Sequence, residues 1–581
     1  MPKKVLFAAL VCGAFLVFVE LSLVVLGVRP ILVEEDPYVG FAARVPLFVE
    51  STGPDGQTHM QTATDKTKLF NVQRFALHKP RGAYRIFCLG GSTTYGRPYD
   101  DTTSFCGWLR ALLPEADPSR RWEVINAGGI SYASYRVALL AESLIRYQPD
   151  LFIVYSGHNE FLEKRTYRRV VDTPAVIRRL GLLLDRTRTG AVIRAAADNL
   201  TGRAGSTHTE GDVLPAEVRT ILENFVGPKA YTRDDAFRRQ VLDHYRFNLT
   251  RIIDIAHRGG ARIMLVKPMS NLRHCSPFKS QHREGLAEPA RHEWEVLYDR
   301  AEQAFATGQW ERAMTAIEKA ATIDDRHAHL HFLRARVLWE QERYAEAKRA
   351  FARARDEDIC PLRALSSIEQ IVDEVAAERG VPQVDFKALV ERQSPHATPG
   401  DEWLLDHVHP TIEGNRQLAL ALLETMNQEG MVRQSNAWAD GVLEQVRQRV
   451  EGSLDVRAHG KALRNVAMVY RWSGKFEDSY RLGKRAVQLF PADAQAHALI
   501  GANAFDLGFI DEAIRHCRQA LQIQPDNAEF HNALGGALVV NGDLEEGIRH
   551  LRRALQLDPD LAIARRNLRR ALARRGEKTA Q

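Results

Sequence analysis

The sequence has few cysteines, and none of them are paired at short spacing. Its 581 residues include six cysteines, no two of which form a Cys-x-x-Cys motif. That motif is typical of zinc ribbons and thioredoxin-like redox sites, so the sequence argues against both. The chain also lacks a run of basic residues interleaved with aromatic ones, and its formal net charge is only +6. We therefore expect no nucleic-acid partner.

One long hydrophobic run stands at the N-terminus, directly after Lys3 and Lys4. It extends over Val5–Val28 and is broken only by Glu20 and Ser22. At about 1.5 Å per residue, a helix of this length crosses a hydrocarbon core of about 30 Å. No small-x-small cleavage site follows the run, which argues against a cleaved signal peptide, the alternative interpretation.

We therefore interpret residues 1–28 as an uncleaved transmembrane signal anchor. Two lysines precede the span and the acidic sequence VEEDP (residues 33–37) follows it. Because positive residues stay on the cytoplasmic side, this asymmetry predicts a single-pass protein of the inner cell membrane. The bulk of the chain is then periplasmic, on the extracytoplasmic side.

The middle of the chain predicts one α/β domain in two parts, residues 81–290 and 361–430. Strand-like apolar runs alternate with helical patterns there, which is typical of a parallel sheet with helices on its faces. Residues 29–80 precede this domain as a stalk that packs onto it, with a loop at residues 51–58. The expected strands are residues 84–90, 122–128, 150–157, 261–268 and 382–386.

Internal repeats with a period of 34 residues follow near the C-terminus. Three sets of positions share this spacing: Gly474, Gly508 and Gly542; Ala486, Ala520 and Ala554; and Pro491, Pro525 and Pro559. This pattern resembles tetratricopeptide repeats (TPRs), in which stacked helix pairs form a groove. We expect a C-terminal array over residues 457–575 that binds protein partners, connected to the α/β domain by a helical linker at residues 431–456.

A shorter array of the same period interrupts the α/β domain at residues 291–360. Its turn glycine, Gly308, is replaced by Glu342 in the second repeat. Ala313 and Ala347, like Ala320 and Ala354, are 34 residues apart. Cys275 and Cys360 flank this insertion; they form either a disulfide that closes its neck or two free thiols.

A basic stretch at residues 163–194 has apolar residues at helical spacing. One interpretation is a lid or a membrane-surface helix. The alternative is an insertion helix that packs on the domain and keeps its arginines in solvent.

Polar segments follow the expected strands at four places. Ser92 follows the first strand, and residues 126–131, 156–161 and 406–410 come near the ends of others. Parallel sheets bind ligands at the carboxyl ends of their strands, so we expect these segments to converge on one crevice.

The residue types in these segments fit acyl transfer. A serine nucleophile needs a base within hydrogen-bond reach, the base needs an orienting acid, and the oxyanion needs donors. His409 stands three positions after Asp406, which lets the carboxylate contact the imidazole that reaches Ser92. Asn159 offers side-chain N–H groups to an oxyanion.

The motifs GGSTTYG, NAGGIS, GHNEF and DHVHP, in this order, resemble the four blocks of the SGNH (GDSL-like) hydrolases. The resemblance implies a flavodoxin-like parallel sheet without metal or cofactor. It makes Ser92 the nucleophile, His409 the base and Asp406 its orienting acid. Asn159 and the backbone N–H groups of Ser92 and Ser131 would form the oxyanion hole.

Two positions depart from the family pattern. The first block reads Gly-Gly-Ser-Thr instead of Gly-Asp-Ser-Leu, and Ser131 stands where the family has a glycine. The first change leaves the base at His409, and the second keeps a backbone donor while adding a side chain near the acyl pocket.

The resemblance implies an esterase that acts on an acylated small molecule or on O-acetyl groups of an envelope or exported glycan. The alternatives are an O-acyltransferase and a TPR scaffold whose hydrolase domain is inactive. A metal site is a further alternative, formed by His158, His407, His409 and Asp406; the acyl-transfer interpretation is favoured because it also explains Ser92 and Asn159.

Overall fold

The computed structural model describes residues 46–53, 56, 58–162, 231–435, 438 and 440–579, together with residues 18–20, 22–23 and 189. Except at those few positions, the predicted anchor and the basic stretch lie outside the described residues. Within the described ranges, no helix is both long and apolar enough to cross a membrane.

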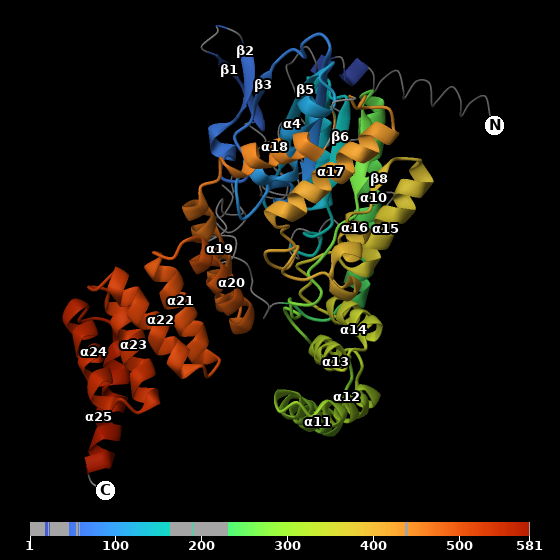
Figure 1. Cartoon of the computed structure of the whole chain (residues 1–581). Coiled ribbons are helices and arrows are strands. Elements are labelled where there is room, and N and C mark those ends of the chain that lie inside the picture. Colours follow the sequence, from blue (N-terminus) through green and yellow to red (C-terminus); the bar gives the residue numbers. More distant parts are fainter. Residues whose placement is uncertain are drawn as a thin grey trace.

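A five-stranded parallel sheet forms the centre of the α/β domain, and every expected strand belongs to it (Figure 1). The order β5-β4-β6-β7-β8 places the first strand, β4, between the second and the third. This is the flavodoxin-like order, in which ligands bind where the chain switches direction, here between β4 and β6. The strands are β4 (Ala83–Gly90), β5 (Arg121–Gly128), β6 (Leu151–Tyr155), β7 (Arg262–Val266) and β8 (Gln383–Val384).

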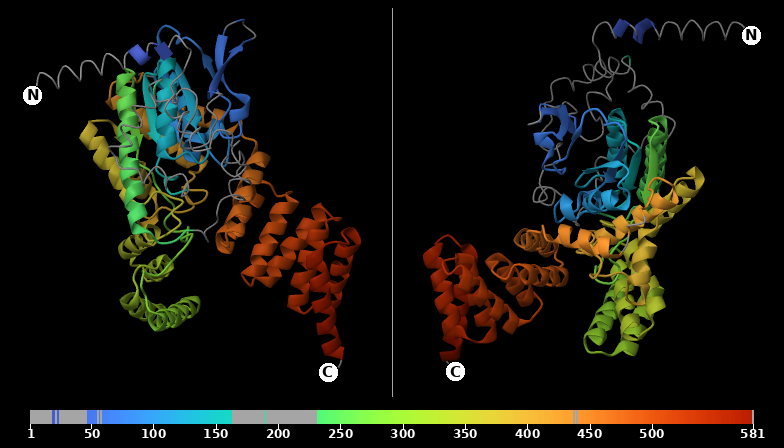
Figure 2. Two further views of the ribbon diagram at one scale, coloured as in Figure 1. Left: turned by 180° about the vertical axis from the view of Figure 1, so that it is seen from behind. Right: turned by 45° about the horizontal axis from the view of Figure 1, so that its top comes forward.

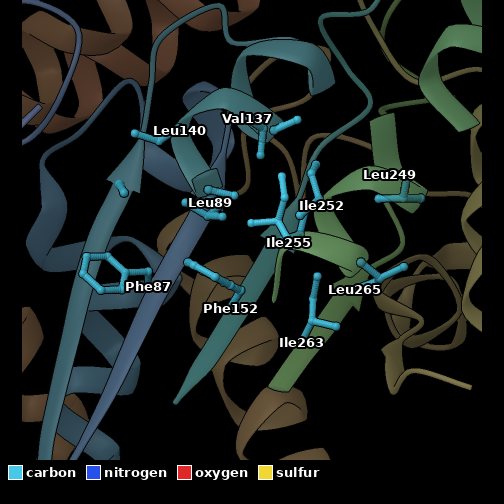
Figure 3. Close-up of a cluster of buried hydrophobic side chains, with 14 of the residues drawn as sticks. Phe87, Leu89, Val137, Leu140, Phe152, Leu249, Ile252, Ile255, Ile263 and Leu265 are labelled. Atoms are coloured by element: carbon cyan, nitrogen blue, oxygen red, sulfur yellow. The ribbon is translucent and has the colours of Figure 1, made fainter. Parts of the chain in front are cut away.

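Helices cover both faces of this sheet because its strands carry apolar side chains on both sides. Phe87, Leu89 and Phe152 point to one face, where they pack with apolar residues of the helices on that side (Figure 3). The alternate residues Ile86 and Cys88 pack on the other face, as the two-residue period of a strand requires. The first face is covered by α5 (Ser134–Leu144), α10 (Asp235–Arg258) and α15 (Ser366–Arg379); the second by α4 (Phe105–Ala116), α16 (Phe386–Gln393), α17 (Ile412–Gln428) and α18 (Asp440–Glu451).

The segment expected to be a stalk contains a small antiparallel sheet. Its strands are β1 (Phe48–Thr52), β2 (Thr58–Thr62) and β3 (Arg74–Ala76), in that order. The loop expected at residues 51–58 is therefore shorter, since β1 continues through Thr52 and β2 begins at Thr58. Phe48 and Phe75 pack against Phe87 of the central sheet, so this small sheet shares the hydrophobic core of the domain.

Four helices form the insertion between β7 and β8, and seven more form the C-terminal array. The insertion contains α11 (Glu288–Ala306), α12 (Trp310–Ile323), α13 (Ala328–Glu340) and α14 (Tyr344–Asp356). The array contains α19 (Val456–Trp472), α20 (Phe476–Leu489), α21 (Ala494–Asp506), α22 (Ile510–Ile523), α23 (Ala528–Asn541), α24 (Leu544–Leu557) and α25 (Ala562–Thr579). The array leads away from the sheet, with α19 and α20 nearest to it and α25 farthest (Figure 2).

The turns inside the helix pairs need a left-handed residue. Gly474, Gly508 and Gly542 have φ values of 81°, 83° and 100°, which glycine adopts without steric cost. Glu342 takes the same turn in the insertion with φ 59°. A glycine is therefore favoured at this position but not required.

Cys275 and Cys360, at the neck of the insertion, are both buried and both free. The structure thus has the two free thiols rather than the disulfide that closes the neck.

Candidate active site

A sharp turn after β4 presents Ser92 at the carboxyl end of the sheet. A Cβ on Gly90 would lie 2.0 Å from the backbone oxygen of Tyr155, so only glycine allows β4 and β6 to approach this closely. Gly91 then precedes α3 (Ser92–Tyr95), a single short helical turn. Ser92 begins this turn and is partly exposed, which leaves its hydroxyl accessible to a substrate.

Ser92, His409 and Asp406 form one hydrogen-bonded chain. The Nε2 atom of His409 lies 2.7 Å from the Oγ of Ser92, and its Nδ1 lies 2.6 Å from the Oδ2 of Asp406. The other carboxylate oxygen of Asp406 accepts backbone N–H bonds from Val408 and His409, both at 2.8 Å. The structure therefore brings Ser92 into contact with a pair of residues that lies more than three hundred positions later in the sequence.

Electrostatics fix the direction of these hydrogen bonds. The Asp406 side chain is only 2% exposed. This burial alone would raise the pKa of Asp406, but the neighbouring His409 and His407 and the hydrogen bonds from His409 hold that pKa well below its usual value. An ionised carboxylate only accepts hydrogen bonds, so Nδ1 of His409 donates to it, and in the neutral imidazole Nε2 then accepts from the Ser92 hydroxyl. This is the arrangement that a general base requires.

Asn159 lies beside the Gly91–Ser92 turn, in the loop that follows β6. Its Nδ2 donates to the backbone oxygen of Tyr132 at 3.1 Å. A Cβ on Gly91, the residue before Ser92, would come within 2.4 Å of the same Nδ2. An amide nitrogen carries two N–H groups, so Asn159 has a second donor in addition to the one bound to Tyr132.

Ser131 lies in the segment that packs against Asn159. Its φ of 62° is left-handed, which explains why glycine suits this position and why serine is strained there. The next residue, Tyr132, provides the carbonyl that holds Asn159. No hydrogen bond joins Ser131 to Ser92 or His409 within the described part of the chain, so Ser131 is placed at this edge only through its neighbours.

His158 and His407 lie near this chain but are not part of it. The Nδ1 of His158 accepts a bond from the backbone N–H of Ala364 at 3.1 Å. Burial, the largest cause, lowers the pKa of each histidine to about 3, so both are neutral at pH 7. Among the described residues, no three His, Cys, Asp or Glu side chains form a group that could hold a metal ion.

Two buried polar residues support the site and were not singled out from the sequence. The carboxylate of Glu160 accepts from the backbone N–H and the hydroxyl of Ser134, at 3.0 and 2.7 Å, and so connects the loop after β6 to the start of α5. The Nδ2 of Asn271 donates to the backbone oxygen of Asp406 at 3.1 Å. Glu160 is part of the GHNEF motif, whereas no sequence signal marks Asn271.

Comparison with known proteins concerns the helical repeats. The tetratricopeptide repeat family matches residues 298–362 and 498–562, in the insertion and in the C-terminal array. No curated protein matches the chain.

Similar solved structures include a mutant O-GlcNAc transferase of Thermobaculum terrenum, with 33% identity over 21% of this chain and 23% of that one, at a TM-score of 0.20. The chain thus covers less than a quarter of that protein. The first TPR domain of human RPAP3 is 18% identical over 22% of this chain and 98% of that one, at a TM-score of 0.21. The Sgt2 TPR domain of Aspergillus fumigatus is 14% identical over 21% of this chain and 83% of that one, at a TM-score of 0.21. The family match at residues 298–362 and 498–562 shows that the chain contains tetratricopeptide repeats, which are protein-interaction modules.

Proposed function

We propose that this protein is a serine esterase of the SGNH type. The observation that carries the proposal is the chain from the Ser92 hydroxyl through the His409 imidazole to the buried Asp406 carboxylate. Its location supports the same function, because Ser92 and Asn159 follow the two strands that flank the switch point of the sheet.

The geometry supports a two-step acyl transfer. The Ser92 oxygen attacks the ester carbonyl while its proton passes to Nε2 of His409, and Asp406 stabilises the resulting imidazolium. The oxyanion accepts hydrogen bonds from the free N–H of Asn159 and from the backbone amides of Ser92 and Ser131. When the intermediate collapses, the leaving alkoxide takes the proton from His409. Water then attacks the acyl-enzyme by the same route and regenerates Ser92.

The proposed substrate is an O-acetylated envelope or exported glycan, and this rests on the resemblance to the SGNH family. The N-terminal apolar run supports a single-pass membrane protein with the active site on the periplasmic side. The repeat arrays support recruitment of protein partners to this site. If a sugar hydroxyl replaces water in the second step, the same residues catalyse O-acyl transfer.

Hydrolysis of p-nitrophenyl acetate by the full-length protein in detergent tests the proposed activity. We expect Ser92→Ala to lower kcat by about 10³-fold or more, because it removes the attacking oxygen. Ser143→Ala is the matched control, since Ser143 is exposed on α5 and its hydroxyl bonds only to the Leu140 carbonyl among the described residues. Equal rates for the wild type and Ser92→Ala would contradict the proposal. Adding a glycan acceptor separates the two second steps, because a transferase then yields acylated glycan.

A further inference from the structure

The first helix pair of the C-terminal array packs directly on the segment that carries Asp406 and His409. Leu405 lies in one hydrophobic cluster with Leu463 of α19 and Leu482 of α20. Nearby, the ring of Tyr99 stacks on that of His459 of α19, with centroids 4.0 Å apart. The first two helices of the array therefore pack against the α/β domain.

A buried hydrogen bond connects α19 with His407, the residue that follows Asp406. The hydroxyl of Tyr470 lies 3.0 Å from Nδ1 of His407, and Tyr470 is only 3% exposed. The Phe278 ring stacks on Tyr470 and meets the edge of His407. On the inner side, the carbonyl of His407 accepts the backbone N–H of Asn271 at 3.0 Å. His407 is thus held from the array and from the sheet domain at once.

A second connection leads from α20 to the backbone of Asp406. Arg481 pairs with Asp401 at 3.0 Å and also donates to the backbone oxygen of His274. The other oxygen of Asp401 accepts from Nδ2 of Asn271 at 2.8 Å, and this nitrogen also donates to the Asp406 carbonyl. Each contact in this path is charge-assisted or buried, which makes it stronger than a solvent-exposed one.

The segment itself has little regular structure to hold it. Residues 401–409 contain no helix or strand, and their only ladder-type pairing in the described chain is the bridge between Leu404 and Pro410. Catalysis nevertheless requires that His409 stay within hydrogen-bond distance of Ser92, and a displacement of about 1 Å costs up to about 10²-fold in rate. The outer contacts therefore have a direct effect on the active-site geometry.

We infer that Tyr470 and Arg481 of the C-terminal array are positioning residues for residues 401–409, which we call the catalytic segment because they include Asp406 and His409. Tyr470 acts through His407 and Arg481 acts through Asp401 and Asn271, so the first C-terminal repeat is a structural part of the active site. The inference rests on the proposed function and extends it, because it makes the rate of acyl transfer depend on a repeat module. It also predicts that removing α19–α25 does not yield a fully active hydrolase domain.

The test is Tyr470→Phe in the full-length protein, with kcat and KM measured for p-nitrophenyl acetate. This change removes only the hydroxyl, so Nδ1 of His407 loses its hydrogen bond to Tyr470 and keeps the longer contact of 3.6 Å with Oδ1 of Asp406. We expect kcat to fall about 3- to 10-fold, the equivalent of one neutral hydrogen bond, with KM within about twofold. A role in folding alone would instead lower the amount of active protein and leave kcat per fluorophosphonate-titrated site unchanged.

Tyr480→Phe is the matched control, because Tyr480 lies on α20 and its hydroxyl contacts Lys484 of the same helix and hydrogen-bonds to Glu512 of α22, away from Asp406 and His409. Arg481→Lys provides a second variant, since lysine keeps the charge but not the fork that reaches Asp401 and His274 together. We expect kcat to fall for this variant as well, and to stay at the wild-type value for Tyr480→Phe. A wild-type kcat in both Tyr470→Phe and Arg481→Lys would overturn the inference.

Hydrogen exchange of the peptide that covers residues 404–410 tests, independently of activity, whether Tyr470 holds this segment in place. We expect faster exchange in Tyr470→Phe than in the wild type or Tyr480→Phe, because the segment loses an outer contact. Unchanged exchange would overturn the inference even if the enzyme is active. Absence of Ser92-dependent hydrolysis in the wild type would instead contradict the proposed function, and the exchange data would still test the positioning contact.

Discussion

The substitution Gly91→Ala tests the proposed oxyanion hole, because we expect it to disturb the position of Asn159 without unfolding the protein. The φ of Gly91 is −88°, so it lies outside the left-handed region that favours glycine. The new Cβ would lie 2.4 Å from Nδ2 of Asn159 and 3.4 Å from the Tyr132 oxygen. The severe contact is thus with the mobile end of one side chain, and the backbone contact is tolerable. We expect the protein to fold normally and Asn159 to move.

The magnitude follows from the size of this displacement. An ordinary contact at 3.4 Å requires Nδ2 to retreat by about 1 Å, which takes it out of hydrogen-bond range of the oxyanion. Removing one oxyanion donor costs about 10²- to 10³-fold in kcat. We therefore expect Gly91→Ala to lower kcat by about 10²-fold while the melting temperature shifts by only a few degrees.

A double-mutant cycle with Asn159→Ala provides the decisive assay. Asn159→Ala alone removes the same donor and should lower kcat by a similar factor. In Gly91→Ala/Asn159→Ala the Cβ has no amide to displace, so kcat should equal that of Asn159→Ala rather than the product of the two effects. Full activity of Gly91→Ala, or multiplicative effects in the double variant, would refute the assignment of Asn159 as an oxyanion donor.

Three further changes probe the same site. Asp406→Asn should lower kcat for p-nitrophenyl acetate by about 10⁴-fold, because an amide no longer fixes the His409 tautomer; a loss below tenfold would argue against a triad. Ser131→Gly should keep kcat within about twofold and raise the melting temperature, since it relieves a left-handed serine but retains the backbone N–H; a large loss would show that the side chain itself takes part. His158→Asn, whose Oδ1 can accept from Ala364, should reduce acid sensitivity. The folded protein holds the pKa of His158 near 3 while the unfolded chain binds a proton near pH 6.5, so the free energy of unfolding decreases as pH falls through this window. Between pH 7 and pH 5, the free energy of unfolding measured with urea should decrease by about 2 kcal/mol less in the variant than in the wild type. Equal decreases in the two proteins would contradict the buried neutral state of His158.

The sequence predicted the parallel sheet and the repeats because each has a strong periodic signal. β6 is a continuous apolar run and β4 is apolar from Ile86 to Leu89, and the glycines at 474, 508 and 542 mark one turn per repeat. Ser92, Asn159, Asp406 and His409 were singled out because each follows an element of this sheet or belongs to a compact motif. The structure brings Ser92, His409 and Asp406 into contact and places Asn159 beside them.

Other features depend on tertiary contacts that no local pattern encodes. The strands β1 and β2 are short and mostly polar, and only Phe48 and Met60 on them reach the core, so the local pattern predicts a stalk rather than a sheet. Tyr470 occupies an ordinary helical position in a repeat. The positioning role inferred for it depends on how α19 packs against the catalytic segment. Asn271 lies in a loop after β7, where nothing in the sequence marks it.

The most direct test of the central claim is to identify the residue that a fluorophosphonate probe labels. We expect mass spectrometry of the labelled wild-type protein to locate the adduct on Ser92, and labelling to slow strongly in His409→Ala, because the probe reacts only with a serine activated by its base. Labelling of another residue, or equal labelling in Ser92→Ala, would contradict the account.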